Sequence, residues 1–188
     1  MRSILITILL LFSATANSAT ITIDFESLEH SDPYITIDSY SEDGFLFTVQ
    51  NSLLGVRGTT DAWYAGSTAL YNGFGGKETV FTKGGEAFDL LSIDVSEIEI
   101  PLGSSTVTFT RDGGHSQTFV TDGPFGFETF LFDSGFLGAT SVSWVSEFGT
   151  PIPQVDNIII NTVPIPATTW LFGSALAGLG WIRRRRTI

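Results

Sequence analysis

Between residues 20 and 162, apolar side chains alternate with polar ones, and glycine-rich turns interrupt the alternation at short intervals. In 21–25, 45–49 and 106–110 the residues at every second position of the alternation are apolar. A period of two is typical of strands that bury one face, and no stretch in this part shows the 3.6-residue period of a helix. The pattern therefore restricts the chain to an all-β fold.

Short strands separated by such turns predict two packed antiparallel sheets, that is, a jelly-roll-like β-sandwich. The segment Arg111-Asp112-Gly113-Gly114 predicts a hairpin, because glycine accepts the positive φ of a tight turn. We expect about ten strands, at 21–26, 34–40, 44–50, 78–83, 87–99, 105–111, 116–121, 127–133, 140–147 and 154–161.

The N-terminal end differs from this pattern. A basic start is followed by the apolar run ILITILLLF at 4–12 and then by small residues. This order is typical of a secretory signal peptide, and the run is shorter than the ~20 apolar residues of a spanning helix. We predict a signal peptide at 1–18, cleaved after Ala16, Ser18 or Ala19, and export by Sec-type machinery.

The C-terminal end combines a proline motif, an uncharged segment at 168–182 and an arginine cluster. As a helix, 168–182 rises only ~22 Å, against ~30 Å of hydrocarbon in a bilayer. Arginines lengthen such a span by reaching lipid phosphates, and they mark the cytoplasmic side. We predict a single transmembrane helix, with a buried helix of a globular domain as the alternative. The motif is Val163, Pro164, Ile165, Pro166 and Ala167, and the membrane-stop cluster is Arg183, Arg184, Arg185 and Arg186.

In this order of parts, residues 163–188 resemble the PEP-CTERM sorting signal of Gram-negative bacteria. Ile165 stands where that family usually has a glutamate. The resemblance implies anchoring in the inner membrane with the domain in the periplasm, followed by processing by an exosortase near the proline motif. It also implies release or transfer to the cell surface, in bacteria that make exopolysaccharide and biofilm.

The part between the two ends, residues 19–162, has the length of one domain. It contains all twenty acidic residues but only four basic ones, Arg57, Lys77, Lys83 and Arg111, so its formal charge is about −16. Such a charge argues against nucleic acid and anionic membrane surfaces as partners. The chain has no cysteine, which excludes thiol nucleophiles and thiolate metal sites.

The order of strand-like segments in this domain also resembles exported β-sandwiches that carry such tails, and these in turn resemble carbohydrate-binding modules. The segments are FDLLSIDV at 88–95, TVTF at 106–109, FLF at 130–132 and VDNIII at 155–160. The resemblance implies a jelly-roll sandwich and exopolysaccharide as a partner.

The longest stretch without strand signals, 55–76, is rich in glycine and carries four aromatic residues: Trp63, Tyr64, Tyr71 and Phe74. Binding residues often lie on loops of a rigid scaffold, and flat aromatic faces suit the apolar faces of sugar rings. We predict these four residues as ligand-binding, with the alternative that they close one end of the core.

Acidic residues occur in the first and the last predicted strand. If these strands pair, the carboxylates of Asp24, Glu26 and Asp156 come close together. They then repel one another unless a cation binds between them. With Asn157, they offer the oxygen ligands that calcium prefers. We predict a structural calcium ion at these four residues; the alternative is a solvated strand face and a turn hydrogen bond.

No catalytic residues are predicted. The two histidines, His30 and His115, have no nucleophile-elbow motif beside them. The sequence therefore favours an exported surface or matrix protein whose sandwich binds exopolysaccharide, and it does not favour an enzyme. The alternatives are an adhesive matrix protein without a defined ligand and a secreted hydrolase.

Overall fold

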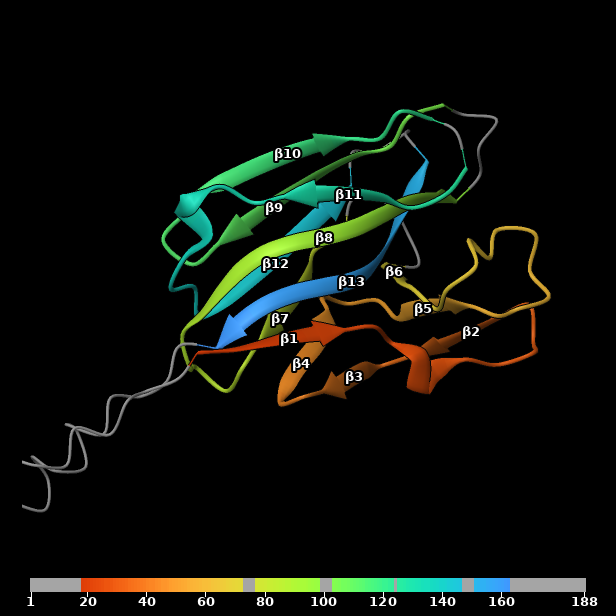
Figure 1. Cartoon of the computed structure of the whole chain (residues 1–188). Coiled ribbons are helices and arrows are strands. Elements are labelled where there is room, and N and C mark those ends of the chain that lie inside the picture. The colour runs from red at the N-terminus through yellow and green to blue at the C-terminus, as the bar shows by residue number, and fades with distance from the viewer. Residues whose placement is uncertain (1–17, 73–76, 99–102, 124, 147–150, 163–188) are drawn as a thin grey trace, which may run out of the picture. The chain divides into compact units, whose positions relative to one another are not determined.

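The computed structural model describes residues 18–72, 77–98, 103–123, 125–146 and 151–162. The predicted signal peptide at 1–18 lies outside this range except for Ser18, and the predicted sorting tail at 163–188 lies outside it entirely. The described residues form an all-β fold of two antiparallel sheets, which confirms the predicted β-sandwich (Figure 1). The narrower jelly-roll description stays a prediction.

One sheet has seven strands, with β1 pairing onto β13 outside the main path. In spatial order the path runs through β11 (Glu128–Leu131), β8 (Phe88–Ile98), β13 (Ile152–Thr162), β6 (Leu70–Asn72), β5 (Leu54–Arg57) and β2 (Tyr34–Ile37). β1 (Ala19–Ile23) is antiparallel to β13, so the first and last described strands are neighbours. The long strands β8 and β13 form the centre of this sheet (Figure 1).

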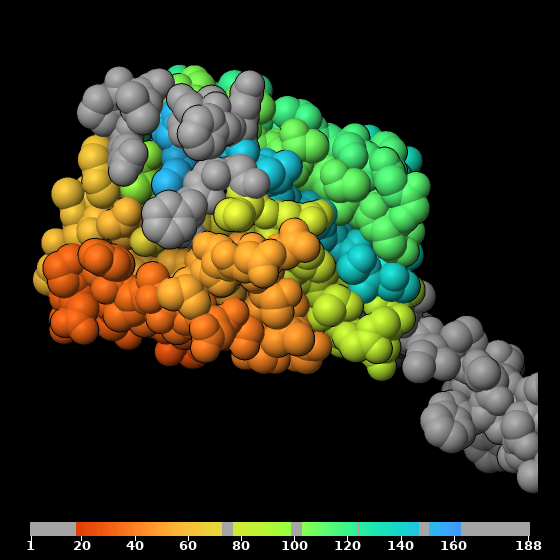
Figure 2. Space-filling view, turned by 180° about the vertical axis from the view of Figure 1, so that it is seen from behind, coloured from red at the N-terminus to blue at the C-terminus, as the bar shows by residue number. Residues whose placement is uncertain are grey.

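The second sheet has six strands. Its order is β10 (Ser116–Val120), β9 (Thr106–Arg111), β12 (Ser141–Ser146), β7 (Thr79–Thr82), β4 (Phe45–Val49) and β3 (Ser39–Glu42). Figure 2 views the molecule from this side, where the colours of β4, β7, β12 and β9 follow one another. Its outward side chains are mostly Ser, Thr and Val, with cross-strand hydroxyl pairs such as Thr108–Thr118 at 2.9 Å. Two short 3-10 turns, Glu26–Leu28 and Ser134–Phe136, complete the elements.

The core lies between the sheets and is rich in aromatic rings. Phe47 stacks on Phe81 at 5.4 Å between ring centroids, and Trp144 lies 6.0 Å from Phe109. Each of these four side chains is at most 1% exposed. They occupy the inward positions of strands that alternate strictly, as β4 does with its buried-exposed pattern. Burial of these rings stabilises the fold, because each removes a large apolar area from water.

The predicted hairpin at 111–114 is confirmed. β9 and β10 pair antiparallel, and Gly113 and Gly114 have φ values of 85° and 87°. These values lie in the left-handed region, which a glycine adopts without the steric cost that a Cβ imposes.

Two expectations about strands were wrong. The predicted strand 34–40 is two strands, β2 and β3, which belong to different sheets. The stretch 55–76 is not wholly irregular, because it contains most of β5 and all of β6. All three residues of β6 are buried, as are the first three of β5. Strands that are buried on both faces show no alternation of apolar and polar residues, so a search for a period of two does not find them.

The placement of two acidic residues is also corrected. β1 ends at Ile23, so Asp24 follows the strand and Glu26 begins a 3-10 turn. Between them Phe25 has a φ of 57°, in the left-handed region. The chain therefore turns at Phe25, and the alternation that gave Asp24 and Glu26 a common orientation does not apply.

No helix in the described part of the chain is long and apolar enough to cross a membrane, and the predicted span at 168–182 lies outside that part.

Candidate functional site

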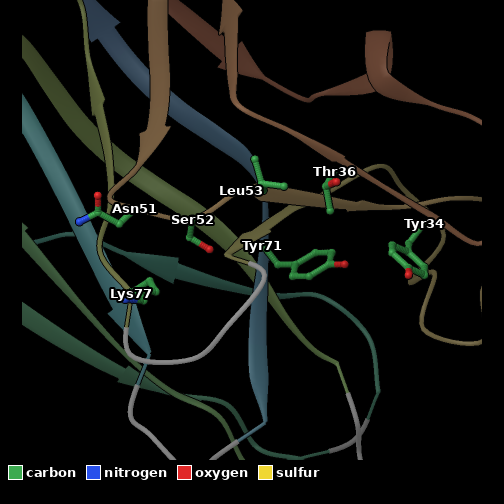
Figure 3. A pocket seen from close by; sticks show the side chains of 7 residues that line it. All are labelled: Tyr34, Thr36, Asn51, Ser52, Leu53, Tyr71 and Lys77. Atoms are coloured by element: carbon green, nitrogen blue, oxygen red, sulfur yellow. The ribbon is translucent and has the colours of Figure 1, made fainter.

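A pocket of about 320 Å³ opens on the outer side of the seven-stranded sheet, where β2, β5 and β6 adjoin (Figure 3). The side chains that line it are Tyr34, Thr36, Asn51, Ser52, Leu53, Tyr71 and Lys77. Figure 3 shows the two tyrosines at one end of this group and Asn51 with Lys77 at the other. We refer to this feature as the tyrosine pocket.

The base of the tyrosine pocket depends on a glycine. Gly55 on β5 is the cross-strand partner of Tyr71 on β6. A Cβ at position 55 would overlap the ring of Tyr71, so the ring lies directly on bare backbone. Tyr71 is only 5% exposed, and burial raises the pKa of its hydroxyl, while the charge of Arg57 acts in the opposite direction. Tyr71 therefore supports the pocket more than it presents a face to solvent.

Arg57 joins the two tyrosines. Its guanidinium carbon lies 4.9 Å from the centroid of the Tyr71 ring and 5.7 Å from that of Tyr34. Its Nη1 also pairs with Oδ2 of Asp61 at 3.1 Å, and the other oxygen of Asp61 accepts the backbone N–H of Trp63. A guanidinium held between aromatic faces and paired with a carboxylate fixes the rings in place.

The exposed surface of the pocket combines apolar faces with short polar groups. Tyr34 is 58% exposed and Leu53 40% exposed, so both offer apolar surface to a ligand. Around them stand the hydroxyls of Thr36 and Ser52 and the amide of Asn51. An exposed ring beside a few convergent donors and acceptors suits a ligand that has both an apolar face and hydroxyl groups.

The aromatic residues predicted as ligand-binding have different positions. Tyr71 lies in the tyrosine pocket. Trp63 is half-buried; it packs edge-on against Phe125 at 6.1 Å, and its carbonyl accepts a hydrogen bond from Gln154. Tyr64 is also half-buried, and burial raises the pKa of its hydroxyl. Phe74 lies outside the described residues. Ligand binding by these four residues stays a prediction.

The sequence reasoning missed Tyr34, the most exposed ring of the site. Tyr34 was included in a predicted strand, where an aromatic residue is ordinary. One signal was available: Tyr34 stands at an outward position, after Pro33 and two residues before Thr36, so its ring has no core to enter.

A second cluster of polar residues lies on the same sheet, where β8 and β13 pair. Asp156 on β13 is opposite Asp94 on β8, and a bulge in β13 follows this pair. Asn157, with a φ of 45°, donates its backbone N–H to Oδ1 of Asp156 at 2.7 Å and its amide to Oδ2 of Asp94 at 3.0 Å. Ser67 donates to Oε1 of Glu26 at 2.8 Å and also hydrogen-bonds Asp156. We refer to these residues as the acidic cluster.

The acidic cluster contains three of the four residues predicted to bind calcium. Asp156 is fully buried, and burial raises the pKa of its carboxyl to about 7, with smaller contributions from the charges of Glu26 and Asp94. Asp24 instead accepts the backbone N–H of Glu26. Within the described ranges, no three or more His, Cys, Asp or Glu side chains are arranged to hold a metal ion. The oxygen donors are of the type that calcium prefers, but most accept hydrogen bonds here. Calcium binding stays a prediction.

The two histidines lie in separate places. His115 is exposed and its Nε2 lies 2.8 Å from Oδ1 of Asp133. His30 packs closely on Gly58, where a Cβ would overlap its ring.

No family model and no curated protein matches the chain. Among solved structures, a mutant family 29 carbohydrate-binding module in complex with mannohexaose aligns with a TM-score of 0.47 and 12% identity, over 78% of this chain and 94% of that one. A second mutant module, in complex with cellulohexaose, aligns with a TM-score of 0.47 and 11% identity, over 78% and 92%. A further family 29 module aligns at 0.47 and 10% identity, over 78% and 90%. Mannohexaose and cellulohexaose are ligands of those modules.

Proposed function

We propose that the β-sandwich is a non-catalytic glycan-binding domain, and that a sugar of an extracellular polysaccharide occupies the tyrosine pocket. The observation that carries the proposal is the exposed ring of Tyr34, held by Arg57 and surrounded by hydroxyl and amide groups. The C–H face of a pyranose packs on such a ring, while the hydroxyls at its rim hydrogen-bond to Thr36, Ser52 and Asn51.

Rigidity supports the same proposal. Binding loses less free energy when the contacting side chains are already ordered. The ring of Tyr34 is fixed through Arg57 to Tyr71 and Asp61, and Tyr71 is fixed by its packing on Gly55. The platform is therefore ordered before a ligand arrives.

A glycan array with three variants tests the proposal. Tyr34→Ala should weaken binding at least about tenfold, the effect expected when an anchoring aromatic is removed from an interface. Leu131→Ala is the control, because Leu131 is 71% exposed at the opposite edge of the sheet. Trp63→Ala tests the residues predicted from sequence. Loss of binding in Trp63→Ala with full binding in Tyr34→Ala would move the site away from the tyrosine pocket.

Two other results would replace the proposal. Binding to no glycan, together with loss of surface cohesion when the protein is deleted, would support an adhesive matrix protein without a defined ligand. Hydrolysis that survives purification and is lost with a single carboxylate would support a secreted hydrolase.

We propose further that the ends of the chain direct it through export to the inner membrane and then, after exosortase processing, to the cell surface. The support is the sequence of 1–18 and of 163–188. Mass spectrometry of the native surface protein tests this. A C-terminus near Ala167 is expected, whereas an intact Arg183–Arg186 terminus would indicate a permanent anchor.

A further inference from the structure

Among the described residues that line it, the tyrosine pocket has a cation and no acid. Its seven lining residues include Lys77 but neither aspartate nor glutamate. This composition departs from that of the domain, in which acidic residues outnumber basic ones twenty to four. The local charge of the pocket is therefore opposite in sign to the charge of the domain that carries it.

Lys77 also differs from the other basic side chains of the described residues. Those three have carboxylate partners: Arg57 pairs with Asp61 at 3.1 Å, Lys83 with Glu86 at 3.6 Å, and Arg111 with Asp112 at 3.5 Å. In the ranges that the structure describes, Lys77 forms no ion pair, and its side chain is exposed. An ammonium group without a partner is available to a ligand.

The backbone of Lys77 is fixed at this position. Asn72, which is fully buried on β6, donates its amide to the carbonyl oxygen of Lys77 at 2.7 Å. Asn72 directly follows Tyr71, so the same strand positions the base of the pocket and the cation at its edge. The exposed side chain of Lys77 extends from this fixed backbone, with its ammonium group at the end.

We propose that the tyrosine pocket selects an acidic oligosaccharide, in which an anionic group binds Lys77. The inference rests on the proposed glycan-binding function and specifies its ligand class. One sugar ring packs on Tyr34, and the carboxylate or sulfate of a ring further along the same oligosaccharide accepts a charge-assisted hydrogen bond from the ammonium of Lys77 at the other end of the pocket. Arg57 does not serve this purpose, because Asp61 already neutralises its charge.

The experiment compares each acidic oligosaccharide with a neutral form of the same ring and length. The probes are hexamers of mannuronate, glucuronate and galacturonate with their methyl esters, and a sulfated galactan hexamer with its desulfated form. We expect at least one acidic probe to bind about tenfold or more tightly than its neutral form, in line with one charge-assisted hydrogen bond. The uronate and sulfate arms identify which anion is recognised.

Two variants assign the preference to its residue. Lys77→Met should reduce the preference to about onefold, because it removes the charge that the anionic group meets. Lys83→Met removes the same charge from a lysine that lies in the connection between β7 and β8, outside the pocket, and pairs with Glu86; it should keep the preference.

Neutral forms that bind as well as the acidic probes would overturn the inference while the glycan-binding function stands. An acid preference that survives Lys77→Met would also overturn it, because the cation would then lie elsewhere. Binding of no probe, acidic or neutral, to the correctly folded protein would count against both the inference and the glycan-binding function.

Discussion

Replacing Asp156 by asparagine should stabilise the protein, and the gain should grow as the pH rises from about 4 to about 7. Asp156 is fully buried on β13, opposite Asp94 and near Glu26. Burial disfavours its ionised form, and the two neighbouring carboxylates add to the effect. The pKa of Asp156 is thereby raised from 3.8 to about 7.

The sign and size follow from proton linkage. Below pH 3.8 the carboxyl is protonated in both the folded and the unfolded chain, so it costs no stability. From there to about pH 7 the unfolded chain releases a proton that the folded protein keeps, and stability falls by about 1.4 kcal/mol per pH unit. The total loss above pH 7 is about 4 kcal/mol as an upper limit, because relaxation of the folded state reduces it.

Asparagine removes this cost and keeps most of the contacts. Its amide oxygen still accepts the N–H of Asn157, while its NH₂ group replaces the oxygen that accepts the longer, 3.3 Å hydrogen bond from the amide of Asn157, so only that contact is lost. Urea unfolding of both proteins at several pH values between about 4 and about 8 gives the difference in unfolding free energy. Asp38→Asn, at an exposed position, is the control for removing a carboxylate.

The difference between Asp156→Asn and the native protein should rise with pH, while that for Asp38→Asn should stay nearly flat. A difference for Asp156→Asn that is equally flat from about pH 4 to about pH 8 would refute the reasoning. Asp156 would then be ionised in the folded protein at no cost, which requires a compensating positive charge in the acidic cluster.

The remaining predictions concern the same sheet. Gly55→Ala should destabilise the protein by about 1–3 kcal/mol, because the new methyl group displaces the ring of Tyr71, and it should weaken glycan binding in the same titrations. Gly58→Ala should cost more, because its Cβ would overlap the main-chain oxygen of Asp32, which moves less easily than a side chain; urea unfolding that shows equal stability for the two variants would contradict this. If the predicted calcium ion binds the acidic cluster, calcium should raise the melting temperature and a chelator should lower it, and both effects should vanish in Asp156→Asn. A melting temperature that neither addition changes would remove the calcium prediction.

The strands that bury one face were predictable from sequence, because a period of two records which side meets the core. Phe45, Phe47 and Val49 of β4 are buried at the positions that the alternation assigns. The hairpin between β9 and β10 was predictable for a similarly local reason, since Gly113 and Gly114 supply the turn. β5 and β6 were not predictable in this way, because their buried residues face both sides.

The tyrosine pocket depends on contacts between residues that are distant in sequence, and the hydrophobic pattern along the chain does not predict such contacts. Tyr34 and Lys77 are far apart in sequence, and they line one pocket only because β2, β5 and β6 are neighbours in the sheet. The role of Arg57 likewise comes from the two rings on either side of it, which belong to the strands that flank β5. Tyr71 was selected from sequence as a ligand-binding residue, and only the structure shows that its packing on Gly55 leaves it 5% exposed at the base of the pocket.

The sequence by itself determined that the domain is all-β, that its alternating strands bury their apolar face, and that its charge is strongly negative, because these properties depend on composition and on spacing along one strand. Only the tertiary structure decided which strands adjoin. With that it placed the one unpaired lysine of the described residues in the same pocket as an exposed tyrosine, and it buried Asp156 opposite Asp94. The physical reason is that a strand pattern fixes which face a side chain takes, whereas its neighbours on that face are set by pairing between strands distant in sequence.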